Sequence, residues 1–219
     1  MKVPQLRKKL EIKSCHNFTW EDNYSWIHQS NILEVLKDKN KLDPEVREYL
    51  IQENNHTEHH LKDTKNLQKK LFDEIKGRIK LDDESLPYKD HTYKYWTKTT
   101  EKGNYSIKLR RKIDTNKIEE IWNGDKEKEK LKVEYFGVGD LEVSHNDKYL
   151  SYSLDTKGSE YYSIFIREIV SNKIVTKEIH DTSGGITFSL DDKYIFYSKL
   201  DKNHRARKIY RHEIGTFND

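Results

Sequence analysis

The 219-residue sequence is poor in several residue types, and each shortage excludes a class of protein. Its one cysteine, Cys15, excludes an internal disulfide framework and a zinc site built on cysteines. The first residues, MKVPQLRKKLEIKSC, lack the apolar segment of a signal peptide. No apolar run approaches the roughly 20 residues that cross a bilayer. We therefore expect a cytoplasmic protein without a membrane partner.

Charge is abundant but balanced. Hydrophobic residues make up 33% of the chain and charged residues 36%, and Ala206 is the single alanine. The 41 basic and 38 acidic residues give a net charge of +3. Nucleic-acid binding needs a concentrated basic face, so we expect no nucleic-acid partner. The densest charged run, KEKEKLK at residues 126–132, alternates in sign and is typical of a solvated loop or helix face.

The first third of the chain has helical periodicity. Asp43 and Pro44 form a good helix start, with an N-cap aspartate before a proline at the first helical position. Apolar residues recur at helical spacing from Val46, and Gly77 marks a plausible helix end. The pattern predicts two helices, or one long bent helix, between about residues 44 and 78. Their apolar stripes are narrow, which favours a place on the surface of something larger.

Three histidines lie within this helical region, in the sequence NNHTEHHL. His56 and His60 are one helical turn apart, a spacing that binds zinc in H-E-x-x-H motifs. The order here is H-T-E-H-H, which matches neither that motif nor its H-x-x-E-H inversion. We interpret His56, His59 and His60 as part of a polar helix face and predict no metal site.

The second half of the chain repeats itself at an offset of 45 residues. Seven positions of the earlier segment are matched: Val143, Ser144, Asp147, Lys148, Tyr149, Tyr152 and Ser153 fall on Phe188, Ser189, Asp192, Lys193, Tyr194, Tyr197 and Ser198. The same offset aligns IFIREI (164–169) with IYRHEI (209–214). A looser copy lies upstream, where YSIKLR (105–110) resembles YSIFIR (162–167).

The repeat predicts strands joined by polar turns. His145-Asn146-Asp147 and Asp191-Asp192 are residues whose side chains bond their own backbone and favour turns. In the strand that follows the second turn, Tyr194 to Tyr197 are apolar on both faces, which predicts a strand covered on both sides. Sheets of about four strands repeated every 40 to 50 residues are typical of a β-propeller. We interpret the repeated tyrosines as core packing.

The number of repeats is small for this fold. Two clear copies and one loose copy fit between about residues 82 and 219, whereas propellers close with four to eight blades. The predicted fold is therefore mainly β with N-terminal helices, an incomplete propeller of two to three blades. We place the helical segment at residues 1–80 and the partial propeller at residues 81–219.

Several segments together resemble one peptidase family. GRIKLDDESLPY (77–88) is similar to the junction between helices and propeller in oligopeptidase B, also called protease II, of the prolyl oligopeptidase family. DPEVREYLIQENNHTEHHL (43–61) resembles the family's long N-terminal helix, with its Tyr-Leu-x-x-Glu-Asn centre at residues 49–54. EDNYSWIHQ (21–29) resembles the Asp-Pro-Tyr-x-Trp-Leu segment, with Asn23 in place of proline. SGGITFSLDDKYIFYSKLD (183–201) and YRHEIG (210–215) resemble the early blades.

The resemblance implies a longer enzyme than this sequence. Family members join a seven-bladed propeller to an α/β-hydrolase domain and cleave short peptides, after Arg or Lys in the oligopeptidase B branch. The propeller covers the active site, and the hydrolase domain carries the Ser-Asp-His triad. The chain corresponds to the N-terminal part of such an enzyme, which we expect to be truncated before the catalytic domain.

We find no nucleophile of that type in the sequence. An α/β-hydrolase presents its serine in a G-x-S-x-G turn, and no such pattern occurs here. SGGI at Ser183 has its glycines on the wrong side of the serine, and GVGD (137–140) is too short for a dinucleotide fingerprint. Ser144, His145 and Asp147 are close in sequence, but their turn recurs without the histidine. We predict no catalytic, cofactor-binding or metal-binding residue and no cofactor.

Three hypotheses follow. In the first, the chain is the propeller portion of an oligopeptidase B-like serine peptidase, inactive unless a separate polypeptide supplies the remaining blades and the hydrolase domain. Short basic peptides would be its substrates only when it is so completed. In the second, it is an interaction module that pairs its open strand edges with another chain or with itself. In the third, it is a decayed gene product that never folds stably.

Overall fold

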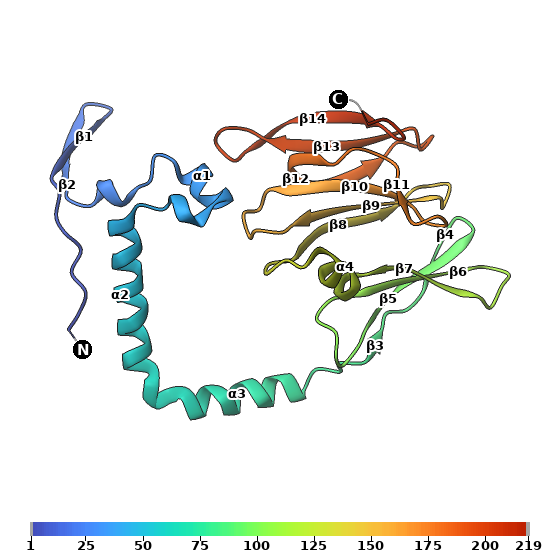
Figure 1. Cartoon of the computed structure of the whole chain (residues 1–219), viewed down its shortest axis with the longest axis horizontal. Helices are drawn as coiled ribbons and strands as arrows, with labels where there is room; N and C mark the ends of the chain where they lie inside the picture. Colours follow the sequence, from blue (N-terminus) through green and yellow to red (C-terminus); the bar gives the residue numbers. More distant parts are fainter. Residues whose placement is uncertain (1, 218–219) are drawn as a thin grey trace. The chain divides into compact units, whose positions relative to one another are not determined.

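A computed structural model describes residues 2–217. Residue 1 of the predicted helical segment (1–80) and residues 218–219 of the predicted partial propeller (81–219) lie outside the described residues. The chain divides into two compact units, Met1–Ile79 and Lys80–Asp219 (Figure 1). The first unit contains the long helices, and the second is built from strands. Within residues 2–217, no helix combines the length and apolarity needed to span a bilayer.

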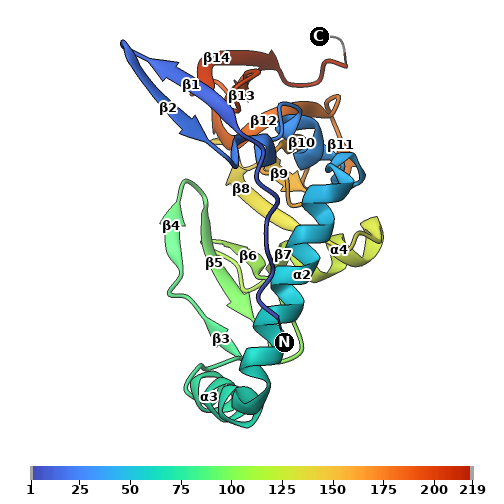
Figure 2. The ribbon, with the colours of Figure 1, turned by 90° about the vertical axis from the view of Figure 1, so that its left-hand side faces the viewer.

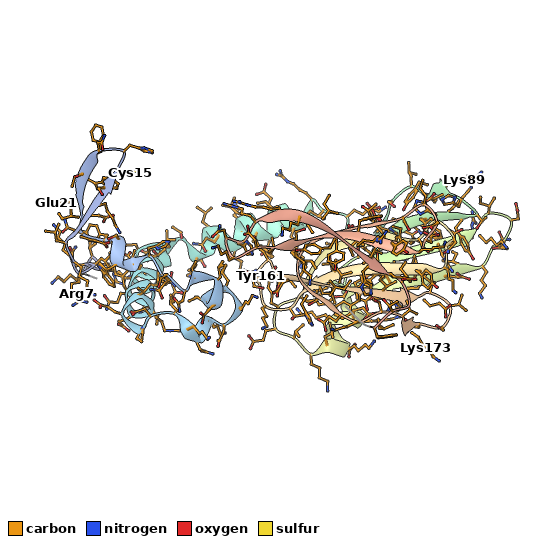
Figure 3. All side chains as sticks on the ribbon, turned by 90° about the horizontal axis from the view of Figure 1, so that it is seen from above. Arg7, Cys15, Glu21, Lys89, Tyr161 and Lys173 are labelled. Atoms are coloured by element: carbon orange, nitrogen blue, oxygen red, sulfur yellow. The ribbon has the colours of Figure 1, made fainter. Side chains whose placement is uncertain are left out.

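The first unit begins with a β-hairpin that the sequence did not indicate. Strands β1 (Glu11–Cys15) and β2 (Phe18–Asp22) pair antiparallel, with Cys15 opposite Phe18 (Figure 2). His16 and Asn17 form the two-residue turn with φ of 47° and 66°. Asparagine tolerates this left-handed conformation, and two such residues suit the twist of a hairpin. The Cys15 side chain is exposed near this turn (Figure 3).

Short helical turns lead from the hairpin to two helices. These turns are η1 (Ser25–Ile27), α1 (Ile32–Lys37) and η2 (Lys39–Lys41). Helix α2 (Pro44–Leu61) starts as predicted, because the Asp43 carboxylate accepts hydrogen bonds from the backbone N–H of Glu45 at 2.8 Å and Val46 at 3.2 Å. The 3₁₀ turn η3 (Lys62–Thr64) then joins α2 to α3 (Lys65–Gly77). The prediction of two helices is therefore confirmed.

The apolar stripe of α3 is uncovered. No residue of α3 is buried, and Phe72 and Ile75 are both 62% exposed. In α2, the one buried residue is Val46. These exposures agree with the narrow stripes in the sequence. The expectation that these helices lie on the surface of a larger structure stays a prediction.

The second unit starts with a five-stranded sheet, called here the first blade. It consists of β3 (Asp83–Glu84), β4 (Tyr88–Asp90), β5 (Tyr93–Thr99), β6 (Ile107–Lys112) and β7 (Ile118–Asn123), all paired antiparallel. Helix α4 (Gly124–Leu131) follows β7, and its C-cap residue, Lys132, has a left-handed conformation with φ of 55°. The alternating charges at residues 126–132 therefore lie mostly on a helix, one of the two structures expected for them.

A seven-stranded sheet contains the two clear repeats. The second blade consists of β8 (Gly137–Val143), β9 (Tyr149–Asp155), β10 (Tyr162–Glu168), β11 (Lys173–Ile174) and the first part of β12 (Ile179–Phe188). The third blade consists of the last part of β12 with β13 (Tyr194–Leu200) and β14 (Ala206–Glu213). Strands β9 and β13 start 45 residues apart, as the sequence repeat predicted.

Strand β12 belongs to both blades. Its first residues pair with β10, where Ile179 lies opposite Ile164, and its last residues pair with β13, where Phe188 lies opposite Ile195. Gly184 lies between these two parts with φ of 94°, a conformation that favours glycine. The register of β12 against both neighbours shifts near this point, so the strand changes partner there.

Two apolar clusters hold the blades together, and the second blade contributes to both. Trp122 and Tyr95 of the first blade pack with Leu150 and Tyr152 of β9. On the other side, Ile164 and Ile166 of β10 pack with buried residues of the third blade, namely Ile186, Phe188, Ile195 and Tyr197. Side chains are accordingly dense within the second unit (Figure 3). Burial of each large apolar side chain contributes about 1.5–3 kcal/mol.

One sequence expectation is wrong for the third blade. Strand β13 was expected to be covered on both faces, but only Ile195 and Tyr197 are buried, at 0% and 9% exposure. Phe196, on the opposite face, is 39% exposed. Strand β9 does have two covered faces, because it lies between the first and third blades. Within residues 80–217, no further blade covers the face of β13 that carries Phe196.

Candidate functional site

The repeated turns have the same internal hydrogen bonds. In the second blade, the Ser144 hydroxyl donates to Asn146 Oδ1 at 2.8 Å and accepts from the backbone N–H of Tyr149 at 2.8 Å. In the third blade, the Ser189 hydroxyl donates to Asp191 Oδ1 at 2.7 Å and accepts from Tyr194 N–H at 3.0 Å. These shared contacts explain why the serine, the Asn or Asp, and the tyrosine recur.

The next residue of each turn has a left-handed backbone. His91, Asp147 and Asp192 occupy this position in the first, second and third blades, with φ of 45°, 60° and 53°. Such a conformation is uncommon outside glycine and is enriched in Asn, Asp and His. All three turns therefore share a backbone geometry, including the loose first copy.

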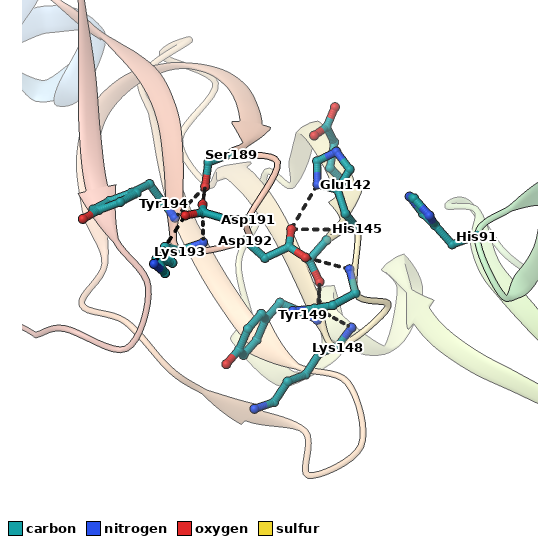
Figure 4. A network of polar contacts seen from close by, with 12 residues as sticks. His91, Glu142, His145, Lys148, Tyr149, Ser189, Asp191, Asp192, Lys193 and Tyr194 are labelled. Carbon is teal, nitrogen blue, oxygen red and sulfur yellow. Dashed lines mark hydrogen bonds and ion pairs between the residues drawn. The ribbon is translucent and has the colours of Figure 1, made fainter.

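The two turn aspartates reach back to the preceding blade. The Asp192 carboxylate accepts hydrogen bonds from the backbone N–H groups of His145 at 2.9 Å and Asn146 at 2.6 Å, and it lies 3.0 Å from His145 Nδ1 (Figure 4). The Asp147 carboxylate accepts from the Thr92 hydroxyl at 2.7 Å and the Tyr95 hydroxyl at 2.6 Å. Burial and the bond to Asp147 raise the pKa of Tyr95. Both aspartates thus connect blades.

These contacts separate the three residues that were close in sequence. Ser144 bonds within its own turn, Asp147 bonds to the first blade, and His145 pairs with Asp192 of the third blade. A catalytic triad needs a serine hydrogen-bonded to a histidine that a carboxylate orients. Among residues 2–217, no hydrogen bond joins a serine to His145. The geometry of the turn is that of a blade connection.

The glycine segments also have structural surroundings. Gly184 lies within β12, where its carbonyl accepts a hydrogen bond from the Ser153 hydroxyl at 2.6 Å. Gly137 and Gly139 lie in β8, and a Cβ on Gly139 would meet Ser153 Oγ at 2.6 Å. Ser183 and its two glycines are therefore inside a strand, whereas a nucleophile turn requires a strand-to-helix junction.

The three histidines of α2 lie together on the helix. The His56 and His60 rings are 4.3 Å apart, and the His59 and His60 rings are 5.6 Å apart. The charge of His56 lowers the pKa of His60. In the part of the chain that the structure describes, no group of three or more His, Cys, Asp or Glu residues is arranged to hold a metal ion.

A cavity that the sequence did not indicate lies in the second unit. It has a volume of about 730 Å³ and is lined by residues of β4, β5, β6, β8, β12 and the two repeated turns. Asp140 and Glu142 of β8 line it together with Lys108 of β6. The Asp140 carboxylate accepts hydrogen bonds from the backbone N–H groups of Leu141 at 2.8 Å and Ile186 at 3.0 Å. Tyr88 and Tyr95 give it aromatic walls. The sequence contains one signal for this cavity, the alternating acidic residues of GVGDLEV (137–143). It did not indicate that Lys108 lies near them.

The charged groups of this cavity are partly desolvated. Burial raises the pKa of Glu142, and the neighbouring Asp140 carboxylate raises it further. Burial lowers the pKa of Lys108, whose ammonium donates to the Leu141 carbonyl at 3.4 Å. No described residue donates a hydrogen bond to the Glu142 carboxylate. A half-buried carboxylate beside aromatic rings suits a cationic group of a ligand.

Comparisons with known proteins agree on one family. The family model described as the N-terminal β-propeller domain of prolyl oligopeptidase matches residues 4–219. Dipeptidyl aminopeptidase BI of Pseudoxanthomonas mexicana is 27% identical over 97% of this chain and 30% of its own length. Protease 2 of Moraxella lacunata is 20% identical over 99% of this chain and 31% of its own length. The chain thus spans about a third of these relatives.

Solved structures show the same fold. Oligopeptidase B from Leishmania major superposes with a TM-score of 0.83 at 22% identity, covering 99% of this chain and 31% of that protein. Oligopeptidase B from Trypanosoma brucei has a TM-score of 0.80 at 22% identity, covering 98% of this chain and 31% of that protein. The chain belongs to the prolyl oligopeptidase family and matches part of the family's N-terminal β-propeller domain.

Proposed function

We propose that this chain is the propeller portion of an oligopeptidase B-like serine endopeptidase that cleaves short peptides after Arg or Lys. The observation that carries the proposal is the match to the family's propeller domain over residues 4–219, together with the superposition on two oligopeptidase B structures. The cavity supports a preference for cationic peptides, since the carboxylates of Asp140 and Glu142 are among its lining groups. We also propose a cytoplasmic location.

The nucleophile of this enzyme would come from a hydrolase domain outside the present sequence. In support, the sequence has no G-x-S-x-G pattern, and His145 and Ser144 make separate structural contacts. We expect the purified chain to leave Arg- and Lys-containing fluorogenic peptides uncleaved and to resist labelling by a fluorophosphonate. Labelling that disappears when a single serine is changed would refute the proposal. A chymotrypsin-like protease of known activity serves as the positive control.

The completed enzyme tests the substrate class. The chain would be co-expressed with a polypeptide that carries the remaining blades and a hydrolase domain, and cleavage after Arg, Lys and neutral residues would be compared. We expect cleavage after basic residues and a rise in KM for Glu142→Gln. An active complex that prefers neutral residues would contradict the proposed specificity while leaving the family assignment intact.

A second candidate function is that of an interaction module. Strand β14 is an edge strand with six successive exposed residues, and Ile209 within it is 78% exposed. Such an edge can pair with another strand. Gel filtration at several concentrations tests self-pairing, because the apparent mass should then rise with concentration. A constant monomer mass would rule self-pairing out.

A further inference from the structure

The cavity of about 730 Å³ in the second unit has charged groups of both signs in its wall. Asp90, Asp140 and Glu142 contribute carboxylates, and Lys108 contributes an ammonium. Small-molecule sites in proteins have volumes of roughly 300–1,000 Å³, so this cavity has the size of a ligand site. The contacts that each charged group already makes within the chain indicate which ligand would suit it.

Two of the three carboxylates have partners within the chain. The Asp140 carboxylate accepts hydrogen bonds from two backbone N–H groups, at 2.8 and 3.0 Å. Asp90 Oδ1 lies 3.5 Å from Nε2 of the neighbouring His91. The Glu142 carboxylate makes no such contact with a described residue, although burial raises its pKa. Glu142 is therefore the carboxylate of this cavity that is free to bind a ligand.

The ammonium of Lys108 also lacks an oppositely charged partner. It donates to the Leu141 carbonyl at 3.4 Å, which is a long bond to a neutral group, and it forms no salt bridge with a described residue. Burial lowers the pKa of Lys108, and the charge of Glu142 opposes this effect. The two side chains are thus near each other without touching. A partly desolvated charge without a partner costs free energy.

A ligand with a single charge would serve only one of these two groups. A cation would pair with Glu142 but add a positive charge beside Lys108, and an anion would do the reverse. A ligand that carries both charges offers a partner to each group. In a peptide, a C-terminal Arg or Lys carries both on one residue, because its side chain is cationic and its main chain ends in a carboxylate.

The aromatic wall of the cavity favours arginine. The Tyr88 side chain is 52% exposed, so its ring is accessible to a ligand. A planar guanidinium stacks on aromatic rings, whereas an ammonium is a compact point charge. The chain itself uses this contact, since the guanidinium carbon of Arg110 lies 4.2 Å from the centre of the Tyr93 ring.

We propose that this cavity binds the C-terminal Arg of a short peptide, whose carboxylate accepts hydrogen bonds from the Lys108 ammonium and whose guanidinium pairs with the Glu142 carboxylate. The site rests on the proposed function for its ligand, because cleavage after Arg releases a peptide with this C-terminus. An internal Arg of an uncleaved peptide lacks the carboxylate. The cavity therefore distinguishes the cleaved peptide from the uncleaved one.

The test measures binding to the full chain alone and needs no catalysis. The dipeptide Ala-Arg is titrated while the NMR shifts of the Leu141 and Thr187 amides are followed, because both residues line the cavity. Ala-Arg amide lacks the carboxylate, and Ala-Ala lacks the guanidinium. We expect each to bind about tenfold more weakly or less, because each loses one charged pair. Ala-Lys should bind between Ala-Arg and Ala-Ala.

Two variants assign the two charges. Lys108→Met keeps the aliphatic stem and should weaken the binding of Ala-Arg about tenfold, while that of Ala-Arg amide should stay nearly unchanged. Glu142→Gln should weaken Ala-Arg similarly and leave Ala-Ala nearly unchanged. Lys202→Met and Glu134→Gln are the matched controls, since both residues are exposed and neither lines the cavity. Both controls should bind Ala-Arg as the original chain does.

Equal binding of Ala-Arg and its amide would overturn the proposal, and this comparison uses the unchanged chain, so it does not depend on whether a variant folds. Equal binding of Ala-Ala, or no saturable binding of Ala-Arg, would overturn it as well. The proposed function fails by a different result. A completed enzyme that cleaves only after neutral residues would refute the proposed specificity, whereas cleavage after Arg without binding of Ala-Arg to this chain would refute this site alone.

Discussion

At the scale of single residues, the sequence predicts that Asp192 lies in a turn, and in the structure its side chain also joins two blades by hydrogen bonds. It is 8% exposed, and its carboxylate binds the backbone of His145 and Asn146 in the preceding blade. The sequence predicted the turn from the adjacent Asp191 and Asp192, whose side chains favour turns. It did not predict the partner, because a contact across 46 or 47 residues depends on how two blades pack.

We expect Asp192→Ala to lower the free energy of unfolding by about 2 kcal/mol, because hydrogen bonds to a charged group contribute roughly 1.5–3 kcal/mol. Urea unfolding followed by circular dichroism measures the change. Lys193→Ala is the control, since its side chain is 70% exposed and its substitution should change stability by less than about 0.5 kcal/mol. Equal effects of the two substitutions would contradict a connecting role for Asp192.

Burial of Glu142 should make the free energy of unfolding depend on pH in a defined direction. Burial raises the pKa of its carboxyl in the folded chain, so the folded state binds this proton more tightly than the unfolded state does. The contribution of Glu142 to stability is therefore unfavourable above the raised pKa, and it is relieved as the pH falls through that pKa toward the ordinary value of 4.5. Because the side chain is half exposed, the effect should stay below about 1 kcal/mol.

Glu142→Gln should accordingly raise the free energy of unfolding at pH 7, and its advantage should shrink as the pH approaches 4.5. Urea titrations at the two pH values measure this difference, with the exposed Glu134→Gln as control. A variant that is less stable than the original chain at pH 7 would show that Glu142 has a stabilising partner. The sequence indicated none of this, since the cavity is lined by segments from Tyr88 to Leu190.

At the scale of elements, the repeat was the informative signal. Its period placed β9 with β13 and β10 with β14, and the Asp43-Pro44 pair located the start of α2. The hairpin β1–β2 escaped prediction because its side chains are largely exposed and show no alternation of burial. The open face of β13 escaped too, because Phe196 is apolar whether or not a neighbour covers it.

Strand β12 depends on a glycine at one position. Gly184 has φ of 94°, and a Cβ there would lie 3.1 Å from the Tyr162 ring. We expect Gly184→Ala to lower the free energy of unfolding by about 1–3 kcal/mol because of backbone strain at positive φ. Gly185→Ala is a closely matched control, since its Cβ would meet nothing within 4 Å. Thermal or urea unfolding of both variants measures the difference, and equal stabilities would remove the argument for a strained position.

At the scale of the whole molecule, the blades differ in how well they are covered. The second blade contributes to both apolar clusters, whereas the first and third blades each contribute to one. Local opening is easiest where few apolar contacts hold a strand. The small number of repeats predicted an incomplete propeller with open strand edges. It could not predict which face of which blade is uncovered, because that depends on the strand order.

We expect amide exchange to be slowest in β9 and at least about tenfold faster along the outer edge of β14. The reason is that residues 150–155 of β9 are buried, whereas β14 is exposed at all positions but His212. Exchange measured by mass spectrometry or NMR at low protein concentration tests the gradient, with the paired interior of β13 as an intermediate. Equal protection of β9 and β14 would mean that the edge is occupied in solution.

The double membership of β12 bears on how such a chain can grow during evolution. The strand pairs with the last long strand of the second blade and with the next strand of the third blade, so the boundary between blades falls inside a continuous strand. A gene segment of 45 codons can be duplicated from any starting point in the repeat. Every copy then contains one complete junction between two blades. Lengthening or shortening the array by one unit therefore preserves every junction, whereas an insertion within residues 182–186 would disturb the pairing of β12 with both blades.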